Sequence, residues 1–311
     1  MKNLYVISGV TGMTGNELAR QLLNDGHTVI GFDNFFASSI DAVQDIVNNK
    51  NFLFYEYDLN NVEQMSEISR LVGRIQQDYA RTIYINCAAV VHTEHFYEVE
   101  HTFTTNVVSM RSFLQQAISV HADTYINCST SEVYSMQSWN ECGGVKEDDF
   151  LLLATAEHSQ RTSYAVGKLL TEFFMKDAVD KGLIKGCSIR FANVYSNHER
   201  FAKHIIPHII DSLSKTGEVI LLENSKKNMR SFLHNIDSCR AVLELMASTS
   251  ALDGTVYNVA TDEEVSIIDL VKLIADKLNI AEPIIKFEGY RASDPERRIL
   301  IKFANVQTGN L

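Results

Sequence analysis

Tyr164 and Lys168 stand four residues apart, in a segment whose pattern predicts a helix over residues 163–179. Side chains at this spacing share one helix face. A phenol with a pKa of about 10 is a poor base at neutral pH, but a neighbouring ammonium group lowers that pKa because it favours the phenolate. The pair therefore predicts a tyrosine base with a lysine beside it. The alternative is an ordinary surface tyrosine, with Lys168 paired to Glu172.

A glycine-rich turn is the second feature with chemical meaning. Glycines occupy positions 9, 12 and 15, between a strand predicted over residues 4–8 and a helix predicted over 16–25. Such a turn lets backbone amides approach a pyrophosphate at the N-terminus of the helix. A structural turn is the alternative, but the order of strand, glycines and helix favours a dinucleotide.

An aspartate at the end of the next predicted strand indicates which dinucleotide. Asp33 lies 18 positions beyond Gly15, where a carboxylate can accept hydrogen bonds from both hydroxyls of the adenosine ribose. The same charge would repel a 2′-phosphate, so NAD is predicted rather than NADP. Asp58, after the third predicted strand, could contact the adenine amino group or cap the following helix. The predicted NAD contacts are Gly9, Thr11, Gly12, Met13, Thr14, Gly15, Asp33, Asn34, Asp58, Leu59, Ala88, Ala89 and Lys168.

Several of these residues follow predicted strands, so a fold that brings the ends of those strands together is needed to form one site. Apolar runs alternate with amphipathic stretches through the first half of the chain, which predicts parallel βαβ units. The runs are almost wholly apolar, as is typical of a sheet covered on both faces. We therefore predict an α/β fold with a doubly wound parallel sheet. The predicted strands are 4–8, 28–32, 52–57, 82–87, 124–128 and 187–191, and the predicted helices are 16–25, 39–48, 62–78, 104–120 and 163–179.

The later sequence predicts a smaller, mixed lobe. Helices are predicted over 201–213 and 267–278, and strands over 219–222 and 255–259. The expected domain organisation follows from this change in pattern. An NAD-binding domain comprises residues 1–192 with a return segment at about 228–260, and a substrate-binding lobe comprises 193–227 and 261–311.

Composition excludes several classes of function. Lys and Arg number 28 and Asp and Glu 39, for a net charge of −11, so binding to nucleic acid or to an anionic membrane is not expected. We see neither a secretory signal nor an apolar run long enough to span a bilayer. Five widely spaced cysteines predict reduced thiols and a cytoplasmic protein. His92 and His95 suggest no third ligand, so no metal site is predicted.

Taken together, the motifs resemble those of the extended short-chain dehydrogenase/reductase superfamily, and within it the NAD-dependent nucleotide-sugar epimerases and dehydratases. The resemblance covers nearly the whole chain. Besides the features above, it rests on Ser129 to Tyr134, Arg190 to Tyr195, Arg230 to Asp237 and Tyr257 to Val259. It implies a Rossmann-type sheet, NAD as cofactor, a nucleotide-diphosphate sugar as substrate and a homodimer.

The resemblance also implies a shared first step. Tyr164 would take the proton of the sugar C4 hydroxyl while hydride passes to NAD, Lys168 would hold the nicotinamide ribose, and Thr130 would hydrogen-bond the C4 oxygen. Glu132 then separates the reactions, because dehydratases place a glutamate there to remove the C5 proton. The dehydratases of dTDP-glucose carry an aspartate where this chain has Ser131, and that aspartate helps the C6 hydroxyl leave. A solvated loop carboxylate is the alternative for Glu132.

Further polar residues match substrate contacts of the family. Arg161, three residues before Tyr164, matches both GDP-mannose 4,6-dehydratases and UDP-glucuronate decarboxylases. Arginine suits a diphosphate because its fork can hold phosphate oxygens bidentately, and a surface ion pair is the alternative for each arginine. The predicted substrate-binding residues are Ser131, Arg161, Asn193, Arg230, Arg297 and Arg298.

The sequence therefore predicts a nucleotide-sugar 4,6-dehydratase. The alternatives within the family are a 4-epimerase and a UDP-glucuronate-type decarboxylase. A non-catalytic, NAD-sensing protein is the alternative of another class, and the intact pair of Tyr164 and Lys168 speaks against it.

Overall fold

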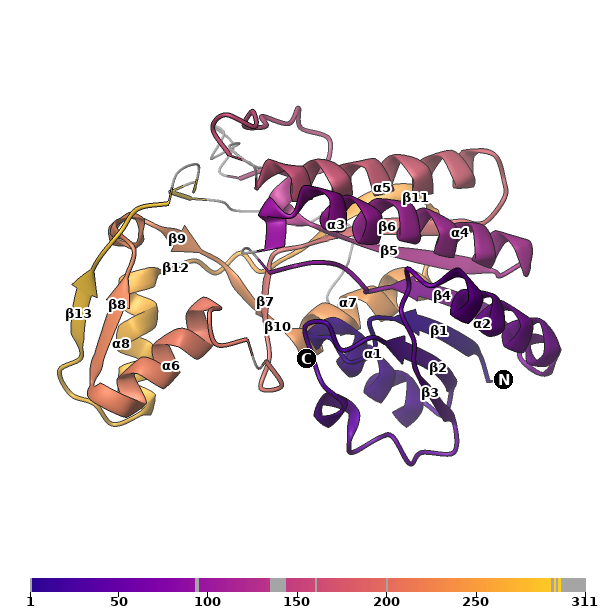
Figure 1. Cartoon of the computed structure of the whole chain (residues 1–311), viewed down its shortest axis with the longest axis horizontal. Coiled ribbons are helices and arrows are strands. Elements are labelled where there is room, and N and C mark those ends of the chain that lie inside the picture. Colours follow the sequence, from indigo (N-terminus) through magenta and orange to yellow (C-terminus); the bar gives the residue numbers. More distant parts are fainter. Residues whose placement is uncertain are drawn as a thin grey trace.

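A computed structural model describes residues 2–92, 95–134, 144–159, 161–199, 201–291, 294, 296 and 297. Its largest element is a sheet of seven strands in the order β3-β2-β1-β4-β5-β6-β11, all paired in parallel (Figure 1). The strand order reverses direction between β1 and β4, and such switch points are where open α/β sheets bind ligands. The strands are β1 (Leu4–Ser8), β2 (Thr28–Asp33), β3 (Phe52–Glu56), β4 (Thr82–Asn86), β5 (Thr124–Thr130), β6 (Lys185–Phe191) and β11 (Asp253–Val259).

Helices cover both faces of this sheet, as the apolar runs predict. Alternate residues of β1 divide between two cores, because successive side chains of a strand point to opposite faces. Tyr5 and Ile7 pack with α1 (Met13–Asn24) and α7 (Asn235–Ala247). Leu4 and Val6 belong to the core under the other helix layer. That layer contains α2 (Val62–Ile75), α3 (Val99–Phe103), the π-helical segment η4 (Thr104–Ser109), α4 (Met110–Ser119) and α5 (Thr162–Asp180).

One predicted helix was wrong. Residues 39–48 contain only a short 3₁₀ turn, η1 (Ile40–Val43). The carbonyl oxygen of Ala42 accepts a hydrogen bond from Arg20 of α1 at 2.5 Å, and the amide of Ile46 bonds back to Val43 at 3.0 Å. An α-helix would instead join Ile46 to Ala42, so the amide of Ile46 follows the tighter 3₁₀ pattern.

The smaller lobe has a core of its own, in which Ile209 and Leu213 pack with Val219 and Val271. Figure 1 shows this lobe beside the large sheet. The helix predicted from residue 201 begins later, at Ile205. The elements of the lobe are α6 (Ile205–Thr216), β8 (Glu218–Leu221), β9 (Met229–Arg230), β12 (Val265–Ser266), α8 (Ile267–Lys277) and β13 (Ile284–Phe287).

Short elements complete the chain. The parallel pair of β7 (Asn193–Tyr195) and β10 (Phe232–His234) lies between the two parts. The remaining 3₁₀ turns are η2 (Gln76–Asp78), η3 (His95–Tyr97), η5 (Ser131–Tyr134), η6 (Glu223–Lys226) and η7 (Thr249–Ala251).

Within the described ranges no helix combines the length and the apolar character needed to cross a membrane.

Candidate active site

A cavity of about 710 Å³ lies at the carboxyl ends of the central strands; we call it the glycine-loop cavity. Its size falls in the range of small-molecule sites. Every residue predicted to contact NAD lines it, from the loop after β1 to Lys168 on α5. The sheet therefore brings together residues that are far apart in the sequence.

The glycine loop is shaped by close backbone contacts. Gly9 has a φ of +68°, and a Cβ atom there would lie 2.6 Å from the Ala88 nitrogen. A Cβ on Gly15 would lie 2.2 Å from the Gly9 oxygen. Gly12 is the N-cap of α1 and offers no side-chain hydrogen bond to its first turn. The amides of that turn are thus left for an anion, which fits the pyrophosphate of NAD.

Asp33 is fixed beside this loop. Its carboxylate accepts hydrogen bonds from the amide of Thr11 at 3.1 Å and the amide of Phe35 at 2.9 Å. Asp58 accepts from the Asn34 amide group at 3.1 Å. The capping alternative for Asp58 was wrong, since the N-cap of α2 is Asn61, whose side chain accepts from the first turn. Both aspartates therefore line the cavity with their carboxylates held in place.

Tyr164 and Lys168 share one face of α5, and both are buried. Lys168 Nζ donates to the Cys128 carbonyl at 2.8 Å. Burial raises the pKa of Tyr164 and the Glu132 carboxylate adds to the rise, whereas a hydrogen bond with Thr130 and the charge of Arg161 lower it. The groups that favour the phenolate here are thus Thr130 and Arg161. Burial also lowers the pKa of Lys168.

The alternative partner for Lys168 has another role. Glu172 forms a buried, bidentate ion pair with Arg190 of β6, at 2.9 and 2.7 Å. It also accepts a hydrogen bond from Ser129 at 2.5 Å. This network joins α5 to β5 and β6, and because Ser129 lines the glycine-loop cavity, it stabilises a wall of the site.

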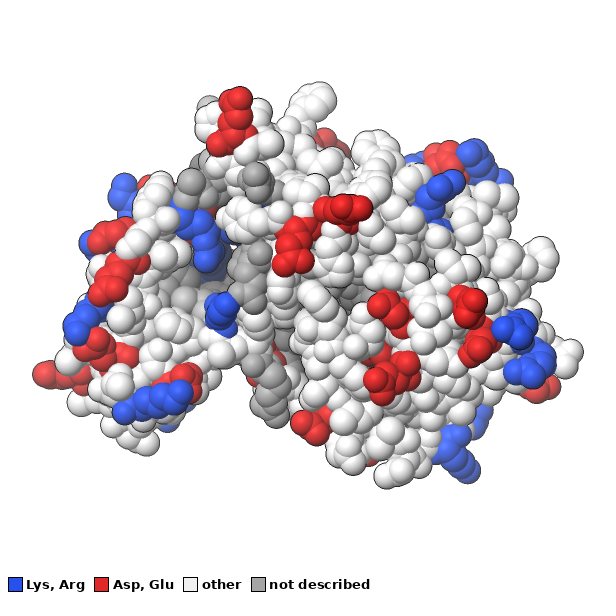
Figure 2. All heavy atoms as spheres, in the orientation of Figure 1, with Lys and Arg blue, Asp and Glu red and all other residues white. Residues whose placement is uncertain are grey.

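A second cavity, of about 750 Å³, lies between the sheet and the smaller lobe; we call it the lobe cavity. Ser131, Glu132 and Arg161 line it, and Arg161 Nη2 lies 3.2 Å from Glu132 Oε2. In Figure 2, side chains of Lys or Arg lie on the smaller lobe's side of the groove between the two parts. Eight of the described residues line both cavities and mark their junction: Val91, Thr130, Tyr164, Phe191, Ala192, Val194, Glu199 and His204.

The residues predicted to bind the diphosphate divide into two groups. Asn193 and Arg230 line the lobe cavity, where Arg230 is ion-paired with Asp294 at 2.9 Å. Arg297 does not line that cavity, and its guanidinium pairs with Glu264. The ion-pair alternative describes Arg297, and the prediction that it faces the substrate lacks support. Arg298 lies outside the described residues.

Sequence reasoning missed several residues of the site. Phe96 stacks on Tyr164, and Glu199 and His204 lie at the junction. Neither Phe96 nor Glu199 belongs to a motif that spacing could reveal, and the spacing of His204 and His208 predicts no more than an amphipathic segment. Across the part of the chain that the structure describes, no three His, Cys, Asp or Glu side chains are grouped so as to hold a metal ion.

Comparison with known proteins places this geometry in context. The model of the NAD dependent epimerase/dehydratase family matches residues 5–260. The dTDP-D-glucose 4,6-dehydratase of Mus musculus is 23% identical over 272 residues, covering 86% of this chain and 70% of the relative. A UDP-N-acetyl-alpha-D-glucosaminuronate decarboxylase of Bacillus cytotoxicus is 25% identical over 290 residues, covering 92% and 83%.

A solved structure shares the fold. The UDP-glucose 4-epimerase of Thermotoga maritima superposes with a TM-score of 0.80 at 20% identity, covering 96% of this chain and 90% of that one. The relatives therefore catalyse three different reactions. Since the family match spans most of the sequence, the chain belongs to the NAD dependent epimerase/dehydratase family, which confirms the predicted Rossmann-type fold and NAD as cofactor.

Proposed function

We propose that the protein is an NAD-dependent 4,6-dehydratase of nucleotide-diphosphate hexoses. One observation carries this proposal. Glu132 is ion-paired with Arg161 on the wall of the lobe cavity, and its negative charge helps to raise the pKa of Tyr164. A carboxylate close to the tyrosine base, in the cavity that would hold the sugar, is what removal of the C5 proton requires.

The residues divide the chemistry among them. Bound NAD would accept a hydride from C4 and return one at C6. Tyr164 takes the proton of the C4 hydroxyl, and Thr130, already hydrogen-bonded to Tyr164, orients the C4 oxygen. Glu132 removes the C5 proton, which the C4 ketone makes acidic, and returns it after water has left. Arg161 keeps that carboxylate in position.

Asn193 and Arg230 are proposed to hold the diphosphate. Both line the lobe cavity, on the side of the junction away from the glycine loop. A substrate anchored there would reach toward Tyr164 with its sugar. Asp294 balances the charge of Arg230 and keeps the guanidinium oriented.

Product analysis tests the reaction. Purified protein is incubated with NAD and with UDP-, GDP-, dTDP- and CDP-linked hexoses and hexuronates, and products are identified by mass spectrometry. Loss of water from a hexose supports the dehydratase. Loss of carbon dioxide from a hexuronate, or an unchanged mass with inverted C4, would replace it with the decarboxylase or the epimerase.

A variant tests the role of Glu132. Glu132→Gln removes the proton acceptor, so water loss should fall by roughly 10²–10⁴-fold while C4 oxidation persists as absorbance of reduced nicotinamide. Glu63→Gln, at an exposed position in the first turn of α2, is the matched control. Full water loss by Glu132→Gln would reject the assignment.

We also propose a homodimer. An apolar strip runs along the outer surfaces of α3, η4 and α5, and its largest members, Phe103 and Phe173, are 51% and 64% exposed. Val108, Val166 and Leu170 are exposed on the same helices. A second copy of the chain would cover the strip. Phe173→Glu should lower the molar mass measured by light scattering to that of one chain, and an unchanged mass would contradict this interface.

A further inference from the structure

The proposed elimination needs a proton donor for the departing hydroxyl. Ser131, which lines the lobe cavity, has no acidic proton to give at neutral pH. Among the residues that the structure describes, three ionisable side chains line both cavities: Tyr164, Glu199 and His204. Tyr164 is occupied with C4, so the donor is to be sought between Glu199 and His204.

Glu199 and His204 are in direct contact. The Glu199 carboxylate meets Nδ1 of His204, and the Glu199 side chain is only 7% exposed. With Nδ1 engaged by a carboxylate, Nε2 is the nitrogen left to exchange a proton. This is the arrangement by which a carboxylate orients an acid–base histidine.

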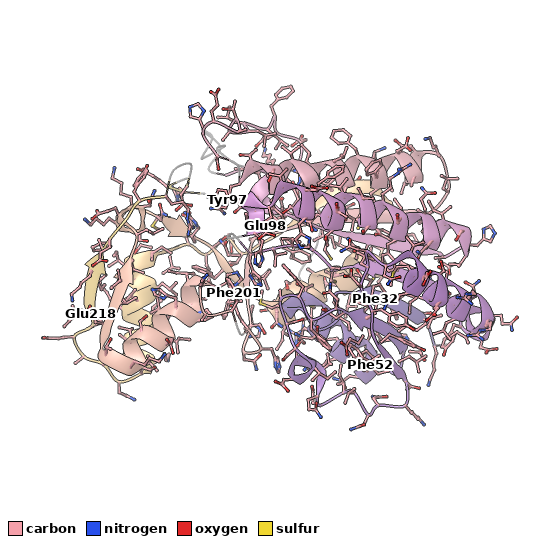
Figure 3. The ribbon with its side chains drawn as sticks, viewed as in Figure 1. Phe32, Phe52, Tyr97, Glu98, Phe201 and Glu218 are labelled. Carbon is pink, nitrogen blue, oxygen red and sulfur yellow. The ribbon has the colours of Figure 1, made fainter. Side chains whose placement is uncertain are left out.

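The backbone holds His204 at the junction. It is the N-cap residue of α6, but its side chain makes no hydrogen bond to the amides of the first helical turn. Its ring lies 4.9 Å from that of Phe201 and 5.4 Å from that of His92, centroid to centroid. Figure 3 labels Phe201 where the two parts of the molecule meet. Aromatic neighbours from both sides of the cleft thus fix the imidazole between the two cavities.

We infer that His204, oriented by Glu199, is the catalytic residue that protonates the leaving C6 hydroxyl. The inference rests on the proposed dehydratase function. Glu132 takes the C5 proton, the electrons of the C5–H bond form the C5–C6 double bond, and the C6–O bond breaks. The departing hydroxyl takes the proton of His204 and leaves as water.

The remaining steps restore the site. The hydride taken from C4 returns at C6, and Glu132 returns its proton to C5. Tyr164 gives up the proton of the C4 hydroxyl, which balances the proton that His204 takes up. His204 regains a proton from solvent, to which its side chain is 36% exposed. Protons and electrons therefore balance with water as the only by-product.

The test uses the full chain with NAD, in D₂O, and the hexose that the wild type dehydrates in the panel above. His204→Asn should lose water roughly 10²–10⁴-fold more slowly. It should still oxidise C4, seen as reduced nicotinamide, and exchange deuterium into C5 of recovered substrate. Glu199→Gln, at a positioning residue, should lower kcat for water loss with KM unchanged.

His121→Asn is the matched control, since His121 is exposed and has a left-handed φ of 56° that Asn tolerates. It should dehydrate at the wild-type rate. Near-normal water loss by His204→Asn would overturn the inference and leave the proposed function intact, as would loss of C4 oxidation and C5 exchange along with water loss. Absence of water loss in the wild type would instead overturn the proposed function and the inference together.

Discussion

The ring of Phe96 lies flat on the ring of Tyr164, with 4.2 Å between centroids and 10° between planes. The guanidinium of Arg161 lies over the Phe96 ring at 5.8 Å and pairs with Glu132. One aromatic side chain thereby joins the group assigned to C4 chemistry to the pair assigned to C5 chemistry. Phe96 comes from η3, far from both in sequence, and its burial indicates that it is part of the packed wall.

Replacing the Phe96 ring with a smaller apolar side chain should impair catalysis more than folding. Phe96→Leu keeps an apolar side chain but removes the stack, so Tyr164 loses its fixed orientation and the rate of C4 oxidation should fall about tenfold. Stopped-flow absorbance of reduced nicotinamide measures that step, and thermal unfolding reports the fold. Phe150→Leu, at a fully exposed phenylalanine, is the control. An unchanged oxidation rate in Phe96→Leu would show that the stack does not position the phenol.

The pH dependence of C4 oxidation should respond oppositely to two changes. Burial raises the pKa of Tyr164, Glu132 raises it further, and Thr130 lowers it. A tyrosine base must be deprotonated, so the rate should rise with pH. Thr130→Val removes a lowering group and should move the rise to higher pH, whereas Glu132→Gln removes a raising group and should move it to lower pH. Initial rates of nicotinamide reduction across pH would check this, and shifts in one direction for both would contradict it.

The fold was predictable because its signals are local. Each central strand is a short apolar run whose neighbours in the sheet are set by the parallel βαβ connection, and β1 begins and ends as predicted. The helix predicted over residues 39–48 was wrong: only a 3₁₀ turn forms there, and its surroundings include contacts of Arg20, distant in the sequence, with the Ala42 carbonyl and the Asp45 carboxylate. Sequence periodicity carries no information about such a contact.

Only the site residues that belong to local sequence motifs were predictable. Gly15, Asp33 and Tyr164 belong to motifs with fixed spacing, and the structure brings them to connected cavities. Glu199 and His204 precede α6, and the amphipathic pattern that predicts a helix from residue 201 marks neither of them for chemistry, so their proximity at the junction shows only in three dimensions. Arg297 illustrates the opposite error: a cationic residue predicted to bind substrate instead forms an ion pair with a carboxylate, that of Glu264.

A side chain at Gly15 should weaken NAD binding because the glycine loop is tightly packed there, whereas one at an open helical position should not. A Cβ there would collide with the backbone of Gly9 and Val10, at 2.2 and 2.8 Å. Gly15→Ala should therefore weaken NAD binding about tenfold or more and lower the melting temperature. Gly73→Ala, inside α2 with nothing near the added Cβ, should leave NAD binding unchanged and stabilise slightly. Fluorescence titration with NAD measures both, and equal affinities would refute the steric argument.

Removing one partner of the buried ion pair should cost far more stability than removing an exposed one. Glu172→Gln leaves the Arg190 guanidinium buried without its counter-charge, so the free energy of unfolding should fall by about 3–5 kcal/mol. Lys176→Gln breaks the half-exposed pair with Asp180 on the same helix and should cost about 0–1 kcal/mol. Urea unfolding followed by circular dichroism compares the two. Similar losses for both variants would mean that the buried pair of Glu172 and Arg190 adds no more stability than a solvated pair.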